Sequence, residues 1–517
     1  MVLAISDFTI ADAVIPPLTR DLGLTVADLG LSFTAYFATA AAFMVLFGRL
    51  GDVVGRRRIM LVAIALFVTG SALSGAAWNL PSFFAGRVLA GLAVAAILPT
   101  GLGVMHALYP APGASRERAF GLWAMAIGAA AVLGPLVGGA AAASTISWRW
   151  AFLGSIPLGL IAAAGVRVTV AENERRGLAG LDLGGALLLA LAAGCLAIAV
   201  DLGGGQGPDL APAGVLLAIS LVTVAGFVAV ERRRLAAGRQ VIAPPDLFRH
   251  RSFRLSTVSS AFMSVGDTGF QLVLPILVGV VLGVGEFGVG AVLACYGAGV
   301  VLGGPVAGRL SRYFDDVLVA RVALAAMPVL LLCLLPMLAR GAAVVGIGAL
   351  LAGYGVAWGV AYARLVNLSY REVPEQDSAV AGGVQSAMRL LAGALGAAIL
   401  TAVFGQVAAA RLADAHGLDA GGRDAVAAQV DTSDAIPSHQ RLKPVALPMP
   451  DDVPASVAVE RAYTDGARVA IVVAAAITAG ALLIAMRLPR DVEAQRVTDG
   501  ARRSRTASKK GCSSASR

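Results

Sequence analysis

The most constraining feature of this sequence is a series of long apolar segments that charged residues barely interrupt. They recur along most of the 517 residues, and only 14% of the residues are charged. About 20 consecutive apolar residues suffice for a helix that crosses a bilayer. An ordinary soluble domain is about 45–50% apolar, whereas this chain is 58% hydrophobic. The sequence therefore predicts an all-α polytopic membrane protein and argues against a soluble enzyme.

Fourteen segments reach that length, and we expect each to form one transmembrane helix. Residues 1–170 are predicted to form an N-terminal six-helix bundle, and 171–253 two inserted spans with a cytoplasmic linker. A C-terminal six-helix bundle over 254–487 is expected to carry an external loop at about 408–465, before a basic cytoplasmic tail over 488–517. The expected arrangement is thus 6+2+6. The segments run over about 1–18, 29–47, 59–79, 83–107, 119–142, 150–170, 183–201, 211–230, 254–282, 287–308, 317–338, 342–365, 378–407 and 466–487.

Arginine is distributed unevenly between the two sides of the expected membrane. The loops after the even-numbered spans hold 21 arginines, whereas the short loops on the other side hold Arg20, Arg149 and Arg340. Because basic residues collect in cytoplasmic loops, both termini are predicted to be cytoplasmic, in the plasma (inner) membrane. Trp148 is expected at the external membrane interface. The net charge of +9 follows from this bias and the basic tail, so it does not indicate a nucleic-acid partner.

The loop after the second expected span reads GRLGDVVGRRR over 48–58 and fits the pattern G-x-L-x-D-x-x-G-R-[KR]. Its glycines permit a tight turn between two helices, and its aspartate can pair with an arginine in one conformation and release it in another. A topology-setting basic loop is the alternative. A weaker echo, GRLSRYFDD, occurs at 308–316. The residues of this candidate conformational latch are Gly48, Asp52, Gly55, Arg56 and Arg57.

A second motif, G-P-x-x-G-G, lies in the fifth expected span. Pro135 has no N–H, so the helix loses a hydrogen bond to the carbonyl of Ala131 and is expected to bend there. Gly134 and Gly138 are four residues apart, which lets a neighbouring helix pack backbone to backbone. We therefore expect a hinge formed by Gly134, Pro135, Gly138 and Gly139; simple helix packing is the alternative.

These motifs resemble those of the major facilitator superfamily, and more closely those of its fourteen-span drug:proton antiporter family, the EmrB/QacA group. The similarity covers essentially the whole chain. Further matching motifs are Asp7-Phe8-Thr9-Ile10 with Pro16 in the first span, Arg87 with Gly91 in the fourth, and Trp148-Arg149-Trp150-Ala151-Phe152 with Pro157-Leu158-Gly159 in the sixth.

The resemblance implies a secondary transporter whose two halves alternate access to a central site. It also implies export driven by the proton gradient. The chain departs from the family pattern at a few positions. Ala90 replaces the usual Gln, Asp12 the usual Asn, and Leu390 and Ala392 stand where Gln and Gly are common. These departures bear on the type of substrate more than on the fold.

Ionisable residues within the expected spans are candidate coupling sites, because one ion at the bilayer centre costs about 2.5–3.5 kcal/mol on insertion scales. Such residues are Asp7, Asp12, Arg87, Asp267 and Arg389. We predict that Asp7 and Asp267 bind the proton or a cation, with Arg87 as an electrostatic modulator. Asp12 is expected near the external mouth. Structural Asp–Arg pairs inside the bundle are the alternative.

Two helix faces are candidate walls of a substrate cavity. By its spacing of three to four residues, Asp267 shares a face with Phe270 and Gln271. An aromatic stripe recurs every four residues over 354–362 and can stack on flat lipophilic cations; ordinary packing is the alternative. The candidate cavity residues are Phe270, Gln271, Tyr354, Trp358 and Arg389.

Several chemistries find no support in the sequence. The only lysines are Lys443, Lys509 and Lys510, so no G-x-x-x-x-G-K-[ST] nucleotide-binding loop exists. The four cysteines and four histidines lack metal-ligand spacing. We expect no catalytic residue, no metal and no cofactor.

The sequence therefore predicts a transporter that exports hydrophobic or cationic drug-like compounds in exchange for protons. Its expected partners are a small-molecule substrate, protons and the lipid bilayer. Two alternatives stay open: an exporter of one specific natural product or metabolite, and a non-transporting membrane sensor or assembly partner. The oligomeric state also stays open. Asp7 follows Met1 by only six residues, so we expect the natural start further upstream.

Overall fold

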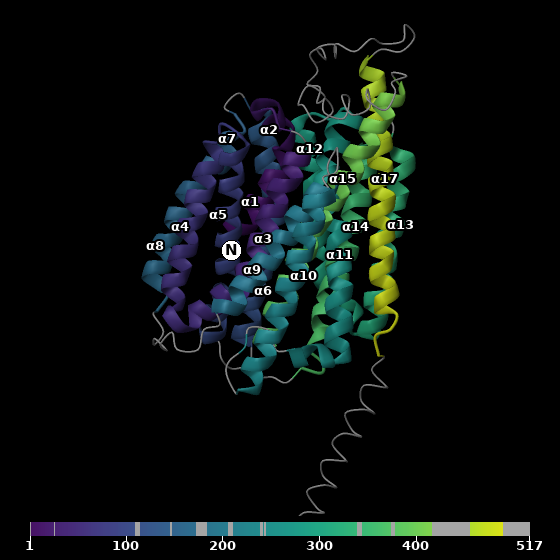
Figure 1. Cartoon of the computed structure of the whole chain (residues 1–517). Helices are drawn as coiled ribbons and strands as arrows, with labels where there is room; N and C mark the ends of the chain where they lie inside the picture. Colours follow the sequence, from purple (N-terminus) through teal and green to yellow (C-terminus); the bar gives the residue numbers. More distant parts are fainter. Residues whose placement is uncertain are drawn as a thin grey trace, which may run out of the picture.

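The computed structural model describes residues 2–24, 26–108, 114–144, 147–171, 183–204, 210–237, 241, 245–338, 344–373, 378–415 and 455–489. All regular structure within these ranges is helical (Figure 1). Each expected span coincides with one helix or with two consecutive helices. Among the described residues, ten helices are long and apolar enough to cross a membrane. The predicted all-α, multi-pass architecture is confirmed, whereas the number fourteen and the 6+2+6 division stay predictions.

The N-terminal part forms one group of helices, drawn in purple and blue in Figure 1. We expected one span over 1–18, but the chain forms two helices there, with a break at Val14. Pro16 and Pro17 have no N–H to continue the hydrogen-bond ladder, which explains the break. The helices are α1 (Val2–Ala13), α2 (Ile15–Leu22), α3 (Val26–Val54), α4 (Arg56–Gly75), α5 (Leu80–Leu108), α6 (Ala114–Ala143), α7 (Arg149–Leu153) and α8 (Ser155–Thr169).

The C-terminal part forms the second group, drawn in teal to yellow in Figure 1. Its first helix runs directly into a π-helical turn, so that the two together give one long span. The elements are η1 (Pro245–Arg249), α11 (Arg251–Ile276), η2 (Leu277–Val281), α12 (Glu286–Leu310), α13 (Asp316–Leu334), η3 (Leu335–Met337), α14 (Val344–Ser369), α15 (Ser378–Ala415) and α17 (Ala455–Ala485).

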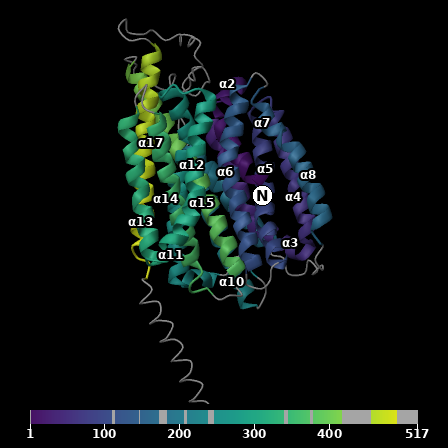
Figure 2. The ribbon, with the colours of Figure 1, turned by 180° about the vertical axis from the view of Figure 1, so that it is seen from behind.

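The two groups repeat the same packing scheme. In the first group α3 and α4 pack on α5, α1 packs on α6, and α4 packs on α8. In the second group α12 and α13 pack on α14, α11 packs on α15, and α13 packs on α17. Across the boundary between the two groups, α6 packs on α12 (Figure 2) and α3 packs on α15. In this repeat α3 is equivalent to α12 and α6 to α15, so each contact joins the same two kinds of helix. The fold therefore contains two structurally similar halves.

Two further helices, α9 (Leu183–Gly204) and α10 (Leu210–Ala236), pack on one another at the boundary between the halves. α9 contacts α3 of one half and α15 of the other (Figure 1). α10 lies outside α9, and many of its large apolar side chains, such as Leu221 and Val222, are exposed, as expected of a helix that faces lipid. These two helices thus cover one of the two seams between the halves.

The other seam, between α6 and α12, contains close backbone contacts beside side-chain contacts such as that of Val301 with Gly128. A Cβ at Gly297 would overlap the carbonyl oxygen of Ala131, and one at Gly290 would overlap that of Pro135. A Cβ at Gly139 would lie 3.0 Å from the Cα of Gly290. Small residues let membrane helices approach closely, because packing rather than the hydrophobic effect holds them together in lipid.

This seam predicts opposite effects for two glycines of α12. Gly297→Ala should lower the melting temperature in detergent and the rate of transport, because the new methyl forces α6 and α12 apart. Gly304→Ala meets open space and should be neutral or stabilise by up to about 1 kcal/mol, through higher helix propensity. Thermal unfolding of both purified variants provides the measurement. Equal melting temperatures would show that the seam tolerates an added methyl group.

Candidate functional site

The first buried polar cluster joins α1, α4 and α5. Nη1 of Arg87 donates to Oδ2 of Asp7 at 2.8 Å, and both side chains are only 1% exposed. Nη2 of Arg87 donates to Oγ of Ser74 at 2.8 Å, and Oγ of Ser71 lies 3.5 Å from Oδ1 of Asp7. The structure thus brings together Asp7 and Arg87 as a paired, hydrogen-bonded ion pair. Hydrogen bonds and pairing are what make buried charges tolerable in a low-dielectric interior.

Aromatic rings complete the surroundings of Arg87. Its guanidinium carbon lies 5.4 Å from the ring centre of Phe83 and 4.9 Å from that of Phe152. Cation–π contacts of this kind help to offset the loss of solvent around a guanidinium. Ser71, Ser74 and Phe83 were not predicted as partners of Asp7 and Arg87. Serines in an apolar segment give no pattern that would identify them.

The second cluster lies in the other half, on α11 and α12. Oδ2 of Asp267 accepts a hydrogen bond from Nε2 of Gln271 at 2.8 Å. Oδ1 accepts one from the hydroxyl of Tyr296 at 3.0 Å. Asp267 is 3% exposed, and it forms no ion pair among the described residues. Arg389 of α15 acts on it electrostatically without bonding to it. Asp267 is therefore a buried acid held by neutral donors.

The helical spacing of Asp267 and Gln271 predicted their contact, whereas Tyr296 was missed. Tyr296 lies 29 positions further along the chain, and a lone tyrosine in an apolar span gives no signal for that contact. The two acidic clusters share no residue. Asp7 and Asp267 thus lie in different halves with different partners.

The aromatic residues of α14 form two groups, of which one packs on the Asp267 cluster and the other on Arg389. The Tyr354 ring lies 5.7 Å from Phe270 and 5.9 Å from Tyr296, and both Tyr354 and Phe270 are 1% exposed. Further along the helix, Trp358 stacks on Tyr362 at 5.1 Å, and Arg389 lies over the Tyr362 ring at 5.2 Å. Phe270 and Tyr354 are thus packed within the protein in this conformation. Trp358 and Arg389 are half-buried.

The loop of the candidate latch joins α3 to α4. Gly55 has a φ of 120°, a backbone conformation that favours glycine. Nη1 of Arg56, the first residue of α4, donates to the carbonyl oxygen of Gly103 near the end of α5 at 2.6 Å. A Cβ at Gly48 would lie 3.2 Å from Pro99, and Arg57 is half-buried. The side chains of Asp52 and Asp12 lie outside the described part of the structure, so their roles stay predictions.

The equivalent loop of the second half makes an equivalent contact. Asp316, the first residue of α13, accepts a hydrogen bond at 2.9 Å from Nη1 of Arg364 near the end of α14. Oγ of Ser311 donates to the same carboxylate at 2.6 Å. The start of α4 is thereby bonded to the end of α5 in the first half, and the start of α13 to the end of α14 in the second half. The weak sequence echo at 308–316 corresponds to this repeated geometry.

The G-P-x-x-G-G motif places α6 directly against the helix that carries Asp7. A Cβ at Gly134 would overlap the side chain of Thr9, and one at Gly138 would lie 2.8 Å from the carbonyl oxygen of Ile10. The hydroxyl of Thr9 donates to the carbonyl of Ala130 at 3.3 Å. α6 therefore contacts α1 with one face and α12 with another.

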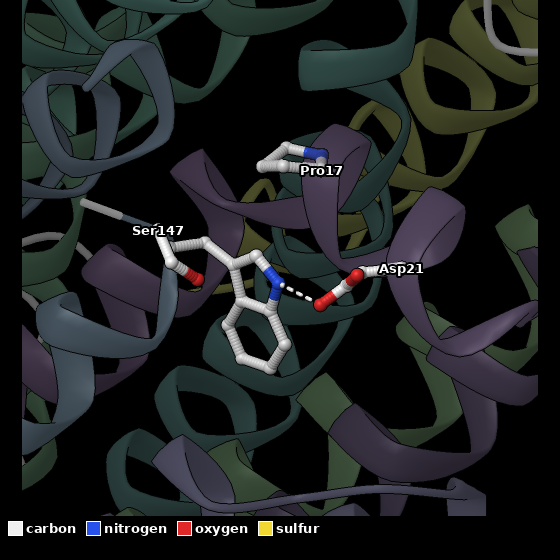
Figure 3. Close-up of a pocket in the computed structure, with 4 residues that line it drawn as sticks. Pro17, Asp21 and Ser147 are labelled. Carbon is white, nitrogen blue, oxygen red and sulfur yellow. Dashed lines mark hydrogen bonds between the residues drawn. The ribbon is translucent and has the colours of Figure 1, made fainter. Parts of the chain in front are cut away.

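A pocket of about 270 Å³ lies at the end of the bundle, lined by Pro17, Asp21, Ser147 and Trp148 (Figure 3). Trp148 is only 4% exposed, and its indole N–H donates to Asp21 at 3.0 Å. Trp148 was expected in an interfacial belt of exposed aromatic residues, but its side chain is buried, because this hydrogen bond turns the indole inward. Arg149 pairs with the same carboxylate. The four residues that line this pocket belong to neither acidic cluster, but Trp148 packs edge-on against Phe152, which contacts Arg87 of the first cluster.

Comparison with known proteins gives a consistent family. The model of the Major Facilitator Superfamily matches residues 1–397. An uncharacterized MFS-type transporter, EfpA, of Mycobacterium tuberculosis is 34% identical over 267 residues, which are 51% of this chain and 48% of EfpA. The alignment thus spans about half of that relative's length. The puromycin resistance protein pur8 of Streptomyces alboniger is 30% identical over 80% of this chain and 82% of its own length.

A solved structure shows the same fold. A bacterial homolog of the human lysosomal transporter Spinster, in an inward-facing and unoccupied conformation, aligns with a TM-score of 0.59 at 15% identity. The alignment covers 94% of this chain and 95% of that one.

The buried ion pair predicts a non-additive pair of variants. Arg87→Gln leaves the Asp7 carboxylate buried without its cation, which should cost about 3–5 kcal/mol of stability. The double variant Asp7→Asn with Arg87→Gln removes both charges and should recover much of that loss. Thermal unfolding in detergent measures the cycle. The cycle also needs the single variant Asp7→Asn. If the loss of stability of the double variant equals the sum of the losses of the two single variants, the charges do not stabilise one another.

The ion pair of Asp21 with Arg149 predicts a pH-dependent effect. The Arg149 guanidinium that bonds to Asp21 holds the pKa of that carboxyl below its ordinary value of 3.8; burial opposes this, and the Trp148 N–H adds to it. A lowered folded-state pKa stabilises the protein above 3.8, and this contribution is lost as the pH falls through the folded value. Asp21→Asn should therefore lower the melting temperature at neutral pH and converge with wild type in acid. Both groups are partly exposed, so the effect should be below about 1 kcal/mol.

The control for this measurement is Asp246→Asn, which removes a more exposed ion pair with Arg249. It should change the melting temperature less at neutral pH. A constant difference between Asp21→Asn and wild type at every pH would contradict the assigned role of the Asp21 charge.

Proposed function

This chain belongs to the Major Facilitator Superfamily, and we propose that it is a proton-coupled antiporter that exports hydrophobic or cationic drug-like compounds. The chain is a multi-pass membrane transporter and not an enzyme. The direction of transport, the coupling ion and the substrate class are parts of the proposal. The name of the relative pur8, a puromycin resistance protein, supports export as the direction.

The observation that carries the proposal is a buried carboxyl group in each half, with unlike partners. Asp267 is hydrogen-bonded by the neutral side chains of Gln271 and Tyr296. Either a proton or a cationic substrate can remove its charge, and two ligands that compete for one charge are thermodynamically coupled. Asp7 is already balanced by Arg87. We therefore assign the exchanging proton to Asp267 and a supporting, charge-balanced role to Asp7.

The proposed mechanism is alternating access between two six-helix halves, with α9 and α10 as the inserted pair. The halves rock about the seams of α6 with α12 and α3 with α15. The hinge residues Gly134, Pro135, Gly138 and Gly139 permit small sliding movements there. The latch loop at 48–58 holds one conformation. Both termini are cytoplasmic in this proposal, and the protein resides in the plasma (inner) membrane.

The aromatic stripe of α14 supports a lipophilic substrate. Trp358 and Tyr362 are stacked and half-buried, and the cationic Arg389 lies over Tyr362. A flat organic cation could replace the guanidinium on this aromatic surface by the same cation–π attraction. A single natural product is the second candidate substrate, favoured by the relative whose name refers to one antibiotic.

The test measures proton release from acid-loaded inverted membrane vesicles with a pH-sensitive dye, while lipophilic cations and neutral drugs are added. Wild type should release protons on addition of a substrate. Asp267→Asn should lose that release, because its amide cannot exchange a proton. Asp7→Asn should also lose coupling, through the unpaired Arg87. The control Asp465→Asn changes a half-buried acid of α17 that belongs to neither acidic cluster, and it should behave like wild type.

Equal protein amounts in all vesicles are verified before the rates are compared. Undiminished proton release by Asp267→Asn would remove Asp267 from the coupling role. Silence of wild type across the whole panel would favour one narrow natural substrate over a multidrug range.

A further inference from the structure

A row of hydroxyl groups without hydrogen-bond partners follows one face of α11. Ser256, Ser260 and Ser264 are four residues apart, and Asp267 continues the same face. All three serines are at most 3% exposed, and none of their hydroxyl oxygens has a hydrogen-bond partner. We call these three serines the serine row. It leads from the beginning of α11 to the acid assigned to proton exchange.

Three buried hydroxyl groups on one helix face without hydrogen-bond partners require a physical explanation. A buried hydroxyl without a hydrogen bond costs about 1–3 kcal/mol. A helical serine can avoid the cost by bonding to the carbonyl four residues earlier, as Thr478 and Thr401 do in this protein. The serine row does not. Buried polar groups that lack protein partners are usually satisfied by ordered water.

The neighbouring face of α11 shows that a partner is available where the helix packs on α17. The hydroxyl of Ser259 is fully buried and donates to the carbonyl of Ala481 on α17 at 2.8 Å. Gly266 on that side meets Thr478 of α17 at close range. The serine row therefore differs from Ser259 on the same helix in having no hydrogen-bond partner on any packed helix.

Two contacts define the ends of the row. At the start of α11, the carboxylate of Glu372 accepts bonds from the backbone N–H and the hydroxyl of Ser252, at 3.1 and 2.7 Å. Near Asp267, the ring of Phe270 packs on Tyr354. Ser252 and Phe270 are eighteen residues apart on α11, about 27 Å. Tyr354 lies within α14 and Glu372 three residues beyond its last residue, Ser369, so α14 and the turn that follows it contact α11 at both ends of the row.

The facing side of α14 is also polar at this level. The indole N–H of Trp358 is buried and has no hydrogen-bond partner. Trp358 lies four residues beyond Tyr354 on α14, in the direction of Glu372. Donors without partners are therefore present on both helices between Asp267 and Glu372.

We propose that the serine row holds a chain of water molecules that carries the proton between Asp267 and Glu372 at the start of α11. This proposal rests on the proposed antiport function. Asp267 gives its proton to the first water, each water and hydroxyl accepts one proton as it donates another, and Glu372 or bulk water receives the last. Asp267 is left as a carboxylate, and the groups in between return to their neutral forms. In the proposed orientation this is the route to the cytoplasm.

The charged and titratable groups around Asp267 are compatible with this route. Tyr296 of α12 donates to it, Tyr354 of α14 packs beside it, and Arg389 of α15 attracts it electrostatically. Arg389 stabilises the carboxylate that remains after the proton leaves. The serine row itself carries no charge that would trap the proton on its way.

The first measurement tests for water and does not depend on a substrate. Ser260→Cys and the control Ser259→Cys are made in a chain in which Cys195, Cys295, Cys333 and Cys512 are replaced by alanine. Both are treated with a small cationic methanethiosulfonate reagent. The cysteine at 260 should react at least about tenfold faster, since only a hydrated thiol ionises readily. Equal, negligible labelling at both positions would overturn the proposal.

The second measurement tests the route with two substitutions of equal shape. Ser260→Val and Ser260→Thr add the same volume, but only threonine keeps a hydroxyl. Substrate-triggered proton release should be slowed about tenfold or more by valine and little by threonine, because a positioned proton-transfer group is worth at least that factor. Substrate affinity, measured by equilibrium binding, should be unchanged in both. Equal rates for the two variants would overturn the route even if the cysteine at 260 is labelled.

A failure of the antiport proposal itself is distinguishable from these outcomes. If wild-type vesicles release no protons with any compound, the proposal of proton-coupled export is contradicted, and so is the proposed proton route. Rapid labelling at 260 would then show that the serine row is hydrated in a protein with another coupling mode.

Discussion

The backbone contact between α6 and α12 is the constraint on which the arrangement of the two halves depends. Glycines on both helices remove the side chains that would otherwise separate them: Gly139 on α6, and Gly290 and Gly297 on α12. The same α6 packs against α1 through Gly134 and Gly138. A shift of α6 at the seam is therefore felt directly by the helix that carries Asp7.

The two buried acids differ in a way that suits different tasks. Asp7 is paired with Arg87, which is enclosed by aromatic rings and bonded to Ser74. Breaking that pair is costly, so it serves as a fixed element that couples α1 to α5. Asp267 is held by neutral donors. Its charge can be removed by a proton or a ligand without leaving a buried cation behind, and this makes it the better exchange site.

The sequence predicted the helices well and the partners of the polar residues poorly. Apolar runs reveal spans because a bilayer sets their length, so each expected segment coincides with helical structure. The spacing of Asp267 and Gln271 within one helix predicted their contact. Tyr296, Ser71 and Phe83 join the sites through contacts between helices, which no pattern within a single span encodes. Trp148 was misplaced for the same reason, since its partner Asp21 lies 127 residues away.

The repeated packing places the buried acids and the glycine contacts in equivalent structural units of the two halves. In the first half, Arg56 at the start of α4 bonds to Gly103 near the end of α5. In the second half, Asp316 at the start of α13 bonds to Arg364 near the end of α14. Each half can therefore move as a unit, with its own buried acid carried inside it. In the proposed mechanism the movement takes place at the seams, where glycines allow α6 to pack closely on α12 and α9 spans the α3–α15 boundary. A charge change at Asp267 alters the balance between conformations only if contacts at these seams differ between them, which links proton exchange to the geometry of α6 and α12.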